Sequence, residues 1–208
     1  MSLRKLLALA ATTLAFAAPA ALAQGQAPFG TISPPQPVDG GGKIEVIEFF
    51  WYGCPHCYTL EPAVTAWLKN APKDVVFRRV PAYPSEGWGE MAKVYYTLEA
   101  MGLLEQNHPK IFDAWHKDKQ NLANKKIREE WLAKNGIDLA KYNEAEKSFS
   151  VATKMQRARQ LTVAYKVDSV PRLVVNGKYF TGPENAGGTQ NMFPVVDRLL
   201  AMVRKEKP

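Results

Sequence analysis

The stretch that decides the fold is residues 44–57, IEVIEFFWYGCPHC. It begins with the apolar, β-branched and aromatic run Ile44 to Phe50, which predicts a buried strand. The segment from Pro55 to Asn70 then carries apolar side chains at helical spacing, namely Leu60, Val64, Trp67 and Leu68. The chain therefore passes from a buried strand into a helix where its only two cysteines, Cys54 and Cys57, lie three residues apart.

A second apolar run, Val75 to Val80, follows this helix and completes a strand–helix–strand unit. We expect its two strands to be parallel, with a right-handed crossover. Residues 90–165 carry helical periodicity interrupted by stop and start signals, including plausible N-caps at Asn124 and Asp138. This region predicts an inserted block of four or five helices.

Strand patterns return after the helical block. Asn176-Gly177 separates Arg172–Val175 from Lys178–Thr181 and predicts a tight hairpin, and a final apolar-striped helix follows. The predicted fold class is α/β, with four strands in one mixed sheet, helices on its faces and a helical block inserted between the two halves.

The N-terminal region has a different character. Met1 to Lys5 is basic, Leu6 to Ala18 is an uncharged apolar run, and Ala21-Leu22-Ala23 is a small-x-small site, so residues 1–23 are predicted to be a cleaved secretory signal peptide. An uncleaved anchor is the alternative. The proline- and glycine-rich arm from Gln24 to Gly42 allows at most one edge strand, near Phe29 to Ile32. Export predicts an oxidising compartment, the periplasm.

Composition and charge are those of an ordinary folded domain, with 46% hydrophobic and 23% charged residues. The net charge of +7 includes Arg4 and Lys5 of the predicted signal peptide. The basic stretch Asn124 to Arg128 is short and is interpreted as a solvated helix start. Nucleic-acid binding is not expected, because neutralising phosphates requires positive side chains clustered on one face.

The cysteine pair is the candidate chemical site. A helix N-terminus presents unpaired N–H groups and a partial positive charge, which stabilise a thiolate. Pro55 suits the first helical turn, and a protonated His56 would add a positive charge that favours the Cys54 thiolate. We therefore expect Cys54 to be the exposed attacking sulfur and Cys57 the sheltered, resolving one. A purely structural disulfide and a zinc half-site are the alternatives, the latter lacking a second cysteine pair.

At these residues the sequence resembles the DsbA family of periplasmic thiol:disulfide oxidoreductases. Residues 48–58 are similar to the active-site segment of that family, and Val170-Pro171 with residues 175–179 is similar to its cis-proline loop and hairpin. The resemblance implies a thioredoxin fold formed by residues 24–89 and 166–208, interrupted by a helical domain at 90–165. It also implies that Pro171 is cis and packs against the disulfide, leaving the Val170 backbone free to pair with a substrate strand.

Glu48 is a further candidate site residue. A carboxylate in a strand buried on both faces is costly, so the pKa of Glu48 should rise. Together with the resemblance, this predicts that Glu48 accepts or donates a proton beneath Cys57. The alternative is an acid at the end of a strand that reaches water.

The resemblance implies a monomeric protein dithiol oxidase that donates its Cys54–Cys57 disulfide to unfolded, exported polypeptides. A membrane quinone-linked partner of the DsbB kind would reoxidise it, and no metal, flavin, nucleotide or other cofactor is expected. A disulfide isomerase or reductase on the same fold is the nearest alternative. A peptide-binding chaperone without catalytic activity, in which the helical block does the work, is the other.

Overall fold

The sheet is built on a central parallel pair of strands. The computed structural model describes residues 27–206, so the predicted signal peptide lies outside the described residues. In this part of the chain a five-stranded sheet has the order β1-β5-β4-β2-β3. The strands are β1 (Gly30–Thr31), β2 (Ile44–Phe50), β3 (Val75–Pro81), β4 (Arg172–Val175) and β5 (Tyr179–Thr181). β2 and β3 are parallel as predicted, the other pairs are antiparallel, and the arm supplies β1 as a fifth, edge strand.

Strand β2 is buried along its whole length because it has a neighbour on each side and helices on both faces. The register of the parallel pair sets Glu48 of β2 beside Arg79 of β3. The predicted hairpin joins β4 to β5. Asn176 and Gly177 both have positive φ, 52° and 65°, which is the conformation that a two-residue hairpin turn requires.

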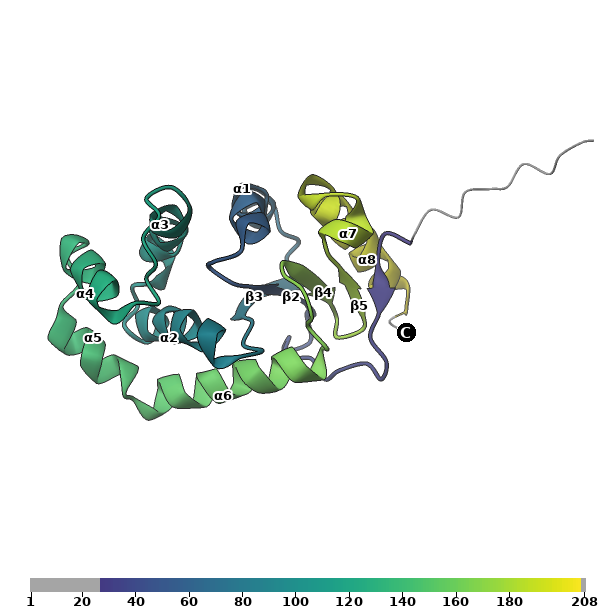
Figure 1. Ribbon diagram of the computed structural model, residues 1–208. Coiled ribbons are helices and arrows are strands. Elements are labelled where there is room, and N and C mark those ends of the chain that lie inside the picture. Colours follow the sequence, from purple (N-terminus) through teal and green to yellow (C-terminus); the bar gives the residue numbers. More distant parts are fainter. Residues whose placement is uncertain (1–26, 207–208) are drawn as a thin grey trace, which may run out of the picture.

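Helices cover both faces of the sheet (Figure 1). On one face lie α1 (Pro55–Lys69) and α8 (Met192–Glu206), which bury residues such as Val46, Leu60 and Leu200 in one core cluster. A short helix α7 (Pro183–Ala186) and a 3-10 turn η1 (Thr189–Asn191) lead into α8. The end of α6 (Phe149–Ala164) covers the other face, where Phe49, Tyr165 and Val174 belong to a second core cluster that continues into the inserted helices.

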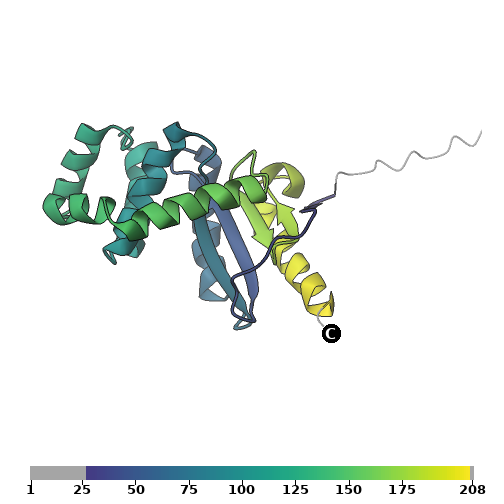
Figure 2. The same cartoon turned by 90° about the horizontal axis from the view of Figure 1, so that it is seen from below.

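The inserted block lies beside the sheet, and its last helix crosses one end of the strands on its way back (Figures 1 and 2). Its members are α2 (Glu86–Ala100), α3 (Leu104–His116), α4 (Lys125–Lys134), α5 (Leu139–Glu146) and α6 (Phe149–Ala164). The N-caps at Asn124 and Asp138 are confirmed, since each side chain accepts two backbone N–H bonds. The first inserted helix begins four residues before the predicted insertion of 90–165.

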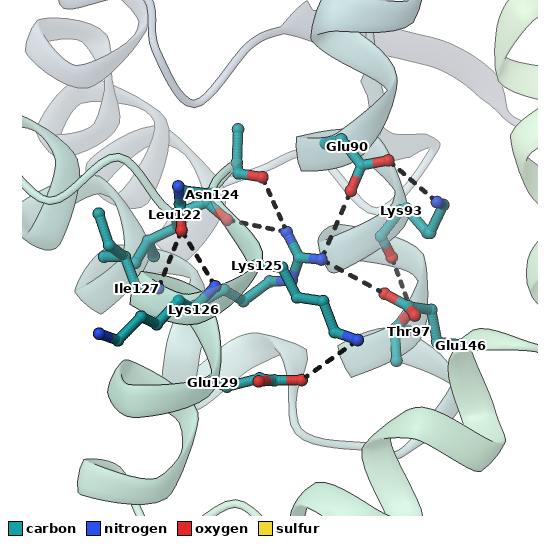
Figure 3. A network of polar contacts seen from close by, with 12 residues as sticks. Glu90, Lys93, Thr97, Leu122, Asn124, Lys125, Lys126, Ile127, Glu129 and Glu146 are labelled. Carbon is teal, nitrogen blue, oxygen red and sulfur yellow. Dashed lines mark hydrogen bonds and ion pairs between the residues drawn. The ribbon is translucent and has the colours of Figure 1, made fainter.

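The interpretation of Asn124 to Arg128 as a solvated helix start is wrong for its last residue. The Arg128 side chain is only 7% exposed. It donates to the carbonyls of Leu122 and Ala123 at 3.0 and 3.2 Å and pairs with Glu90 of α2 and Glu146 of α5 (Figure 3). Arg128 therefore ties α4 to its two neighbours, because the helices pack around it and leave water little access.

None of the helices among residues 27–206 is both long and apolar enough to cross a bilayer.

Candidate active site

The two cysteines lie where β2 passes into α1. Cys54 is the N-cap of α1, with extended backbone angles, and Pro55 occupies the first helical position. A turn before the helix is closed by the bond from Cys54 N to Trp51 O at 3.0 Å. This geometry sets the Cys54 sulfur at the helix N-terminus and Cys57 one turn further in, as the strand-to-helix pattern predicts.

Cys54 is the more easily ionised sulfur. A hydrogen bond from the Cys57 thiol is the largest cause, and with backbone N–H groups of Cys57 and His56 it lowers the pKa of Cys54 from 9.0 to about 6, although burial opposes the change. The charge of the exposed His56 contributes least. That lowering corresponds to about 4 kcal/mol in favour of the thiolate. The predicted activation is present, but its main source is the Cys57 thiol, with the N–H groups of the helix N-terminus contributing less and the predicted charge of His56 least.

Cys57 has the opposite environment. It is 0% exposed, and burial raises its pKa well above the usual 9.0. The hydrogen bond it donates to Cys54 and the negative charge of the Cys54 thiolate raise it further, as does Glu48 when ionised. Cys54 is 8% exposed, so it is the more accessible of the two sulfurs, as expected. It is nevertheless largely buried, which the sequence did not predict.

The cis-proline loop faces Cys54 across the fold. The Val170–Pro171 peptide bond is cis, and the Cys54 thiol donates to the Val170 carbonyl at 3.3 Å. Residues 116 apart in sequence thus meet because β4, which begins at Arg172, pairs directly with β2. The structure therefore brings the two segments of the family resemblance into contact.

A groove of about 540 Å³ lies beside this contact. It runs along the cis-proline loop and the start of α7, and its lining is half polar in character, with His56, Asp168, Arg172, Phe180 and Glu184 among its residues. The Arg172 guanidinium lies 4.5 Å from the centre of the Phe180 ring and pairs with Asp168. An extended peptide lying here would pass His56 and the backbone of Val170, whose carbonyl accepts from the Cys54 thiol.

Glu48 lies in the interior and does not reach water. It is 0% exposed, and burial raises its pKa from 4.5 to about 8, with the negative charge of Glu61 adding to the effect and Arg79 opposing it. One carboxylate oxygen accepts from Arg79 Nε at 3.2 Å, whereas Oε1 has no hydrogen-bond partner. A carboxyl in this setting holds its proton at neutral pH.

Sequence reasoning missed the partners of Glu48. Arg79 also bonds Glu61 of α1 at 3.2 Å, and Glu61 lies 3.4 Å from His108 Nε2 on α3. Burial opposes ionisation of Glu61, but His108 and Arg79 outweigh it and lower its pKa. A signal for Arg79 was present, because a parallel register starting from the first residues of the two apolar runs pairs Glu48 with Arg79. His108 carried no such signal, since only tertiary packing brings α3 to this point.

Across residues 27–206, no group of three or more His, Cys, Asp or Glu side chains is arranged to hold a metal ion. What the site offers is one stabilised thiolate, a second thiol held protonated beside it, and an adjacent groove. These are the parts that thiol–disulfide exchange requires, because the low-pKa sulfur is both a good nucleophile and a good leaving group.

Comparisons with known proteins give the same picture. The family described as the DSBA-like thioredoxin domain matches residues 71–199. A thiol:disulfide interchange protein DsbA of Bordetella parapertussis is 46% identical over 95% of this chain and 94% of its own length. The protein of that name from Azotobacter vinelandii is 46% identical over 81% and 78%.

Solved structures agree with these sequences. The crystal structure of Pseudomonas aeruginosa DsbA matches with a TM-score of 0.81 and 38% identity, covering 86% of this chain and 94% of that one. The oxidoreductase NmDsbA1 from Neisseria meningitidis matches with a TM-score of 0.77 and 27% identity, covering 90% and 97%. The similarity therefore extends over both the sheet and the helical insertion.

Proposed function

The chain belongs to the DsbA family, and from that premise we propose that its Cys54–Cys57 disulfide is passed to exported polypeptides as they fold. The protein is a thiol:disulfide oxidoreductase of the thioredoxin fold. This assignment excludes a binding module without catalytic activity.

The exchange begins with a substrate thiolate that attacks Cys54 Sγ. A sulfur–sulfur bond forms between substrate and Cys54, the Cys54–Cys57 bond breaks, and its electron pair goes to Cys57. A second substrate thiolate then attacks the substrate sulfur of this mixed disulfide and displaces Cys54 as a thiolate. The substrate leaves oxidised by two electrons and the protein is left reduced by two.

The observation that carries this direction is the contrast between the two sulfurs. The Cys54 thiolate is favoured by a pKa of about 6, and stabilising the reduced form makes the disulfide a stronger oxidant. At pH 7 a pKa of about 6 in place of 9 stabilises the reduced form by about 1.4 kcal/mol, which corresponds to roughly 30 mV for a two-electron couple. A reductase would need a smaller stabilisation of its reduced form.

Three further groups have proposed roles. Glu48, which its pKa of about 8 keeps protonated at neutral pH, gives its proton to Cys57 as that sulfur leaves, since the two groups are close enough for the charge of an ionised Glu48 to raise the pKa of Cys57. The backbone of Val170, next to cis Pro171, pairs with the substrate strand beside the groove. His56 contributes a positive charge near Cys54.

The setting of this reaction follows from the same premise. Residues 1–23 would direct export to the periplasm, where unfolded polypeptides with free thiols are the substrates. The reduced dithiol must lose two electrons in each cycle, and a membrane quinone-linked protein of the DsbB kind would accept them. The chain would need no cofactor beyond its own disulfide.

Equilibration with glutathione tests the direction. The oxidised protein is mixed with reduced and oxidised glutathione at fixed ratios, and the dithiol fraction is measured by alkylation. We expect a potential clearly more oxidising than that of thioredoxin, about −270 mV. A value near −270 mV would favour the reductase alternative instead.

A further inference from the structure

His108 is a buried titratable side chain that the exchange steps above do not use. It is 5% exposed and lies on α3, within the helical insertion. Its Nδ1 is 2.7 Å from the Tyr52 hydroxyl, and its Nε2 is 3.4 Å from Glu61 Oε1. Helix α3 thus adds His108 to a cluster of three charged or titratable side chains, Glu48 of β2, Glu61 of α1 and Arg79 of β3.

The cluster has two protonation states of equal net charge. With Glu48 protonated and His108 neutral, the charges of Arg79 and Glu61 cancel. With Glu48 ionised and His108 protonated, two positive and two negative charges cancel again. Loss of the Glu48 proton alone would leave one uncompensated negative charge among buried groups, which is unfavourable.

We propose that His108 is a positioning residue for the exchange reaction, taking up a solvent proton when Glu48 gives its own proton to the departing Cys57 sulfur. This inference rests on the proposed role of Glu48. The Cys54–Cys57 bond breaks, the electron pair and the Glu48 proton go to Cys57, and one proton from solvent goes to His108. Glu48 later recovers a proton from solvent and His108 releases one, so the completed step takes up a single proton.

Solvent reaches this end of the cluster through a second groove. A cavity of about 460 Å³ between α1 and α3 is lined by Glu61, Arg79 and His108. Glu48, by contrast, is fully buried. The groove therefore gives His108 an aqueous proton source on the side of the molecule where α3 packs against α1.

The groups around His108 favour a neutral resting state that a new negative charge can reverse. Burial lowers the pKa of His108, and Glu61 opposes that effect. The titratable and charged groups that face it come from the segment after β2, from α1, β3, α2 and α3: Tyr52, Glu61, Lys69, Arg79, Tyr95 and Glu105. Arg79 adds to the effect of burial by lowering the pKa of His108, and an ionised Glu48, which pairs with Arg79, would offset that positive charge.

The test is a double-mutant cycle on the whole protein. The probe is glutathione, and the rate constant of its reaction with the oxidised protein is measured from pH 5 to 9 for the native protein, His108→Gln, Glu48→Gln and the double variant. Because glutathione titrates identically in all four, ratios of rates report the protein alone. We expect His108→Gln to be about tenfold slower at pH 6, the equivalent of one pKa unit, with the ratio approaching one at pH 9.

The double variant separates this role from a structural one. Without a Glu48 proton to transfer there is no charge to compensate, so adding His108→Gln to Glu48→Gln should slow the reaction no further. A purely structural defect would slow both backgrounds equally, and that result would overturn the proposal. His116→Gln is the matched control, since His116 lies on the same helix and bonds the Tyr52 carbonyl at 2.8 Å; we expect its rate to be unchanged.

The two single variants distinguish failure of the role proposed for Glu48 from failure of the role proposed for His108. If Glu48→Gln slows the reaction but His108→Gln does not, the role of Glu48 stands and the inference about His108 is wrong. If Glu48→Gln leaves the rate unchanged at every pH, the proton-donor role of Glu48 fails, and the role of His108 fails with it.

Discussion

The surroundings of Cys54 and those of Cys57 differ in almost every physical respect, although the two residues are three apart. Cys54 lies at a helix tip beside a groove and receives hydrogen bonds that lower its pKa to about 6. Cys57 lies in the interior next to a carboxyl, and its pKa is raised. The motif at residues 54–57 therefore supplies the two sulfurs, while the side chains packed around them determine which one ionises.

Replacing the outer sulfur removes one side of the comparison and should have the largest effect. We expect Cys54→Ser to abolish oxidation of a dithiol peptide, because no sulfur remains for the substrate to attack. Cys57→Ser keeps that sulfur and, when mixed with oxidised glutathione, should accumulate the Cys54–glutathione mixed disulfide with release of one glutathione thiolate, because no second protein thiol remains to resolve it. Peptide oxidation that persists in Cys54→Ser would rule out the proposed attack at Cys54.

Titration of the Cys54 sulfur measures its pKa directly. Absorbance of the reduced protein at 240 nm should show a thiolate midpoint near pH 6. Cys57→Ala removes the largest cause of that shift, the hydrogen bond from Cys57, so its midpoint should move upward. A midpoint near 9 in the unaltered protein would remove the driving force for oxidation.

Replacing Glu48, the buried carboxyl near Cys57, tests the surroundings of the inner sulfur. The native state holds the Glu48 proton up to about pH 8, whereas the unfolded chain releases it near 4.5, so the native state binds more protons between these values. The stability contribution is therefore fully present below pH 4.5 and is lost as pH rises through about 8. We expect a loss on the order of 3 kcal/mol between pH 5 and 8 that is absent in Glu48→Gln.

Urea unfolding of the oxidised protein at several pH values measures this difference. Oxidised protein is used because Cys54 then has no thiol to titrate. Parallel pH curves for the two proteins would mean that Glu48 titrates normally and is not the buried acid described above.

A substitution in the helical insertion, far from both sulfurs, should have a small effect on stability and none on the redox site. Asn124→Ala removes the cap of α4, whose side chain accepts from Lys126 N and Ile127 N. We expect a loss of about 1 kcal/mol in the free energy of unfolding, with the reduction potential unchanged. A shifted potential would show that the insertion acts on the redox site as a whole rather than through residues such as His108.

The local signals in the sequence predicted most of the fold. The apolar runs of β2 and β3, the Asn-Gly turn and the caps at Asn124 and Asp138 depend on neighbours close in the chain, so they could be interpreted without the structure. The thiolate at Cys54 was predicted for a related reason, since the end of a helix is itself a local feature. Arg128 was misinterpreted because its burial depends on three helices.

The strand–helix junction, the cysteine pair and the buried acid Glu48 can be inferred from the sequence, because spacing and hydrophobic pattern act over a few residues. Only the tertiary structure decided that Val170 contacts Cys54 and that Glu48 is linked through Arg79 and Glu61 to His108. Those contacts join residues 18 to 116 positions apart in the chain. The physical reason is that electrostatic and hydrogen-bond energies depend on distance in space, which chain position does not encode at that range.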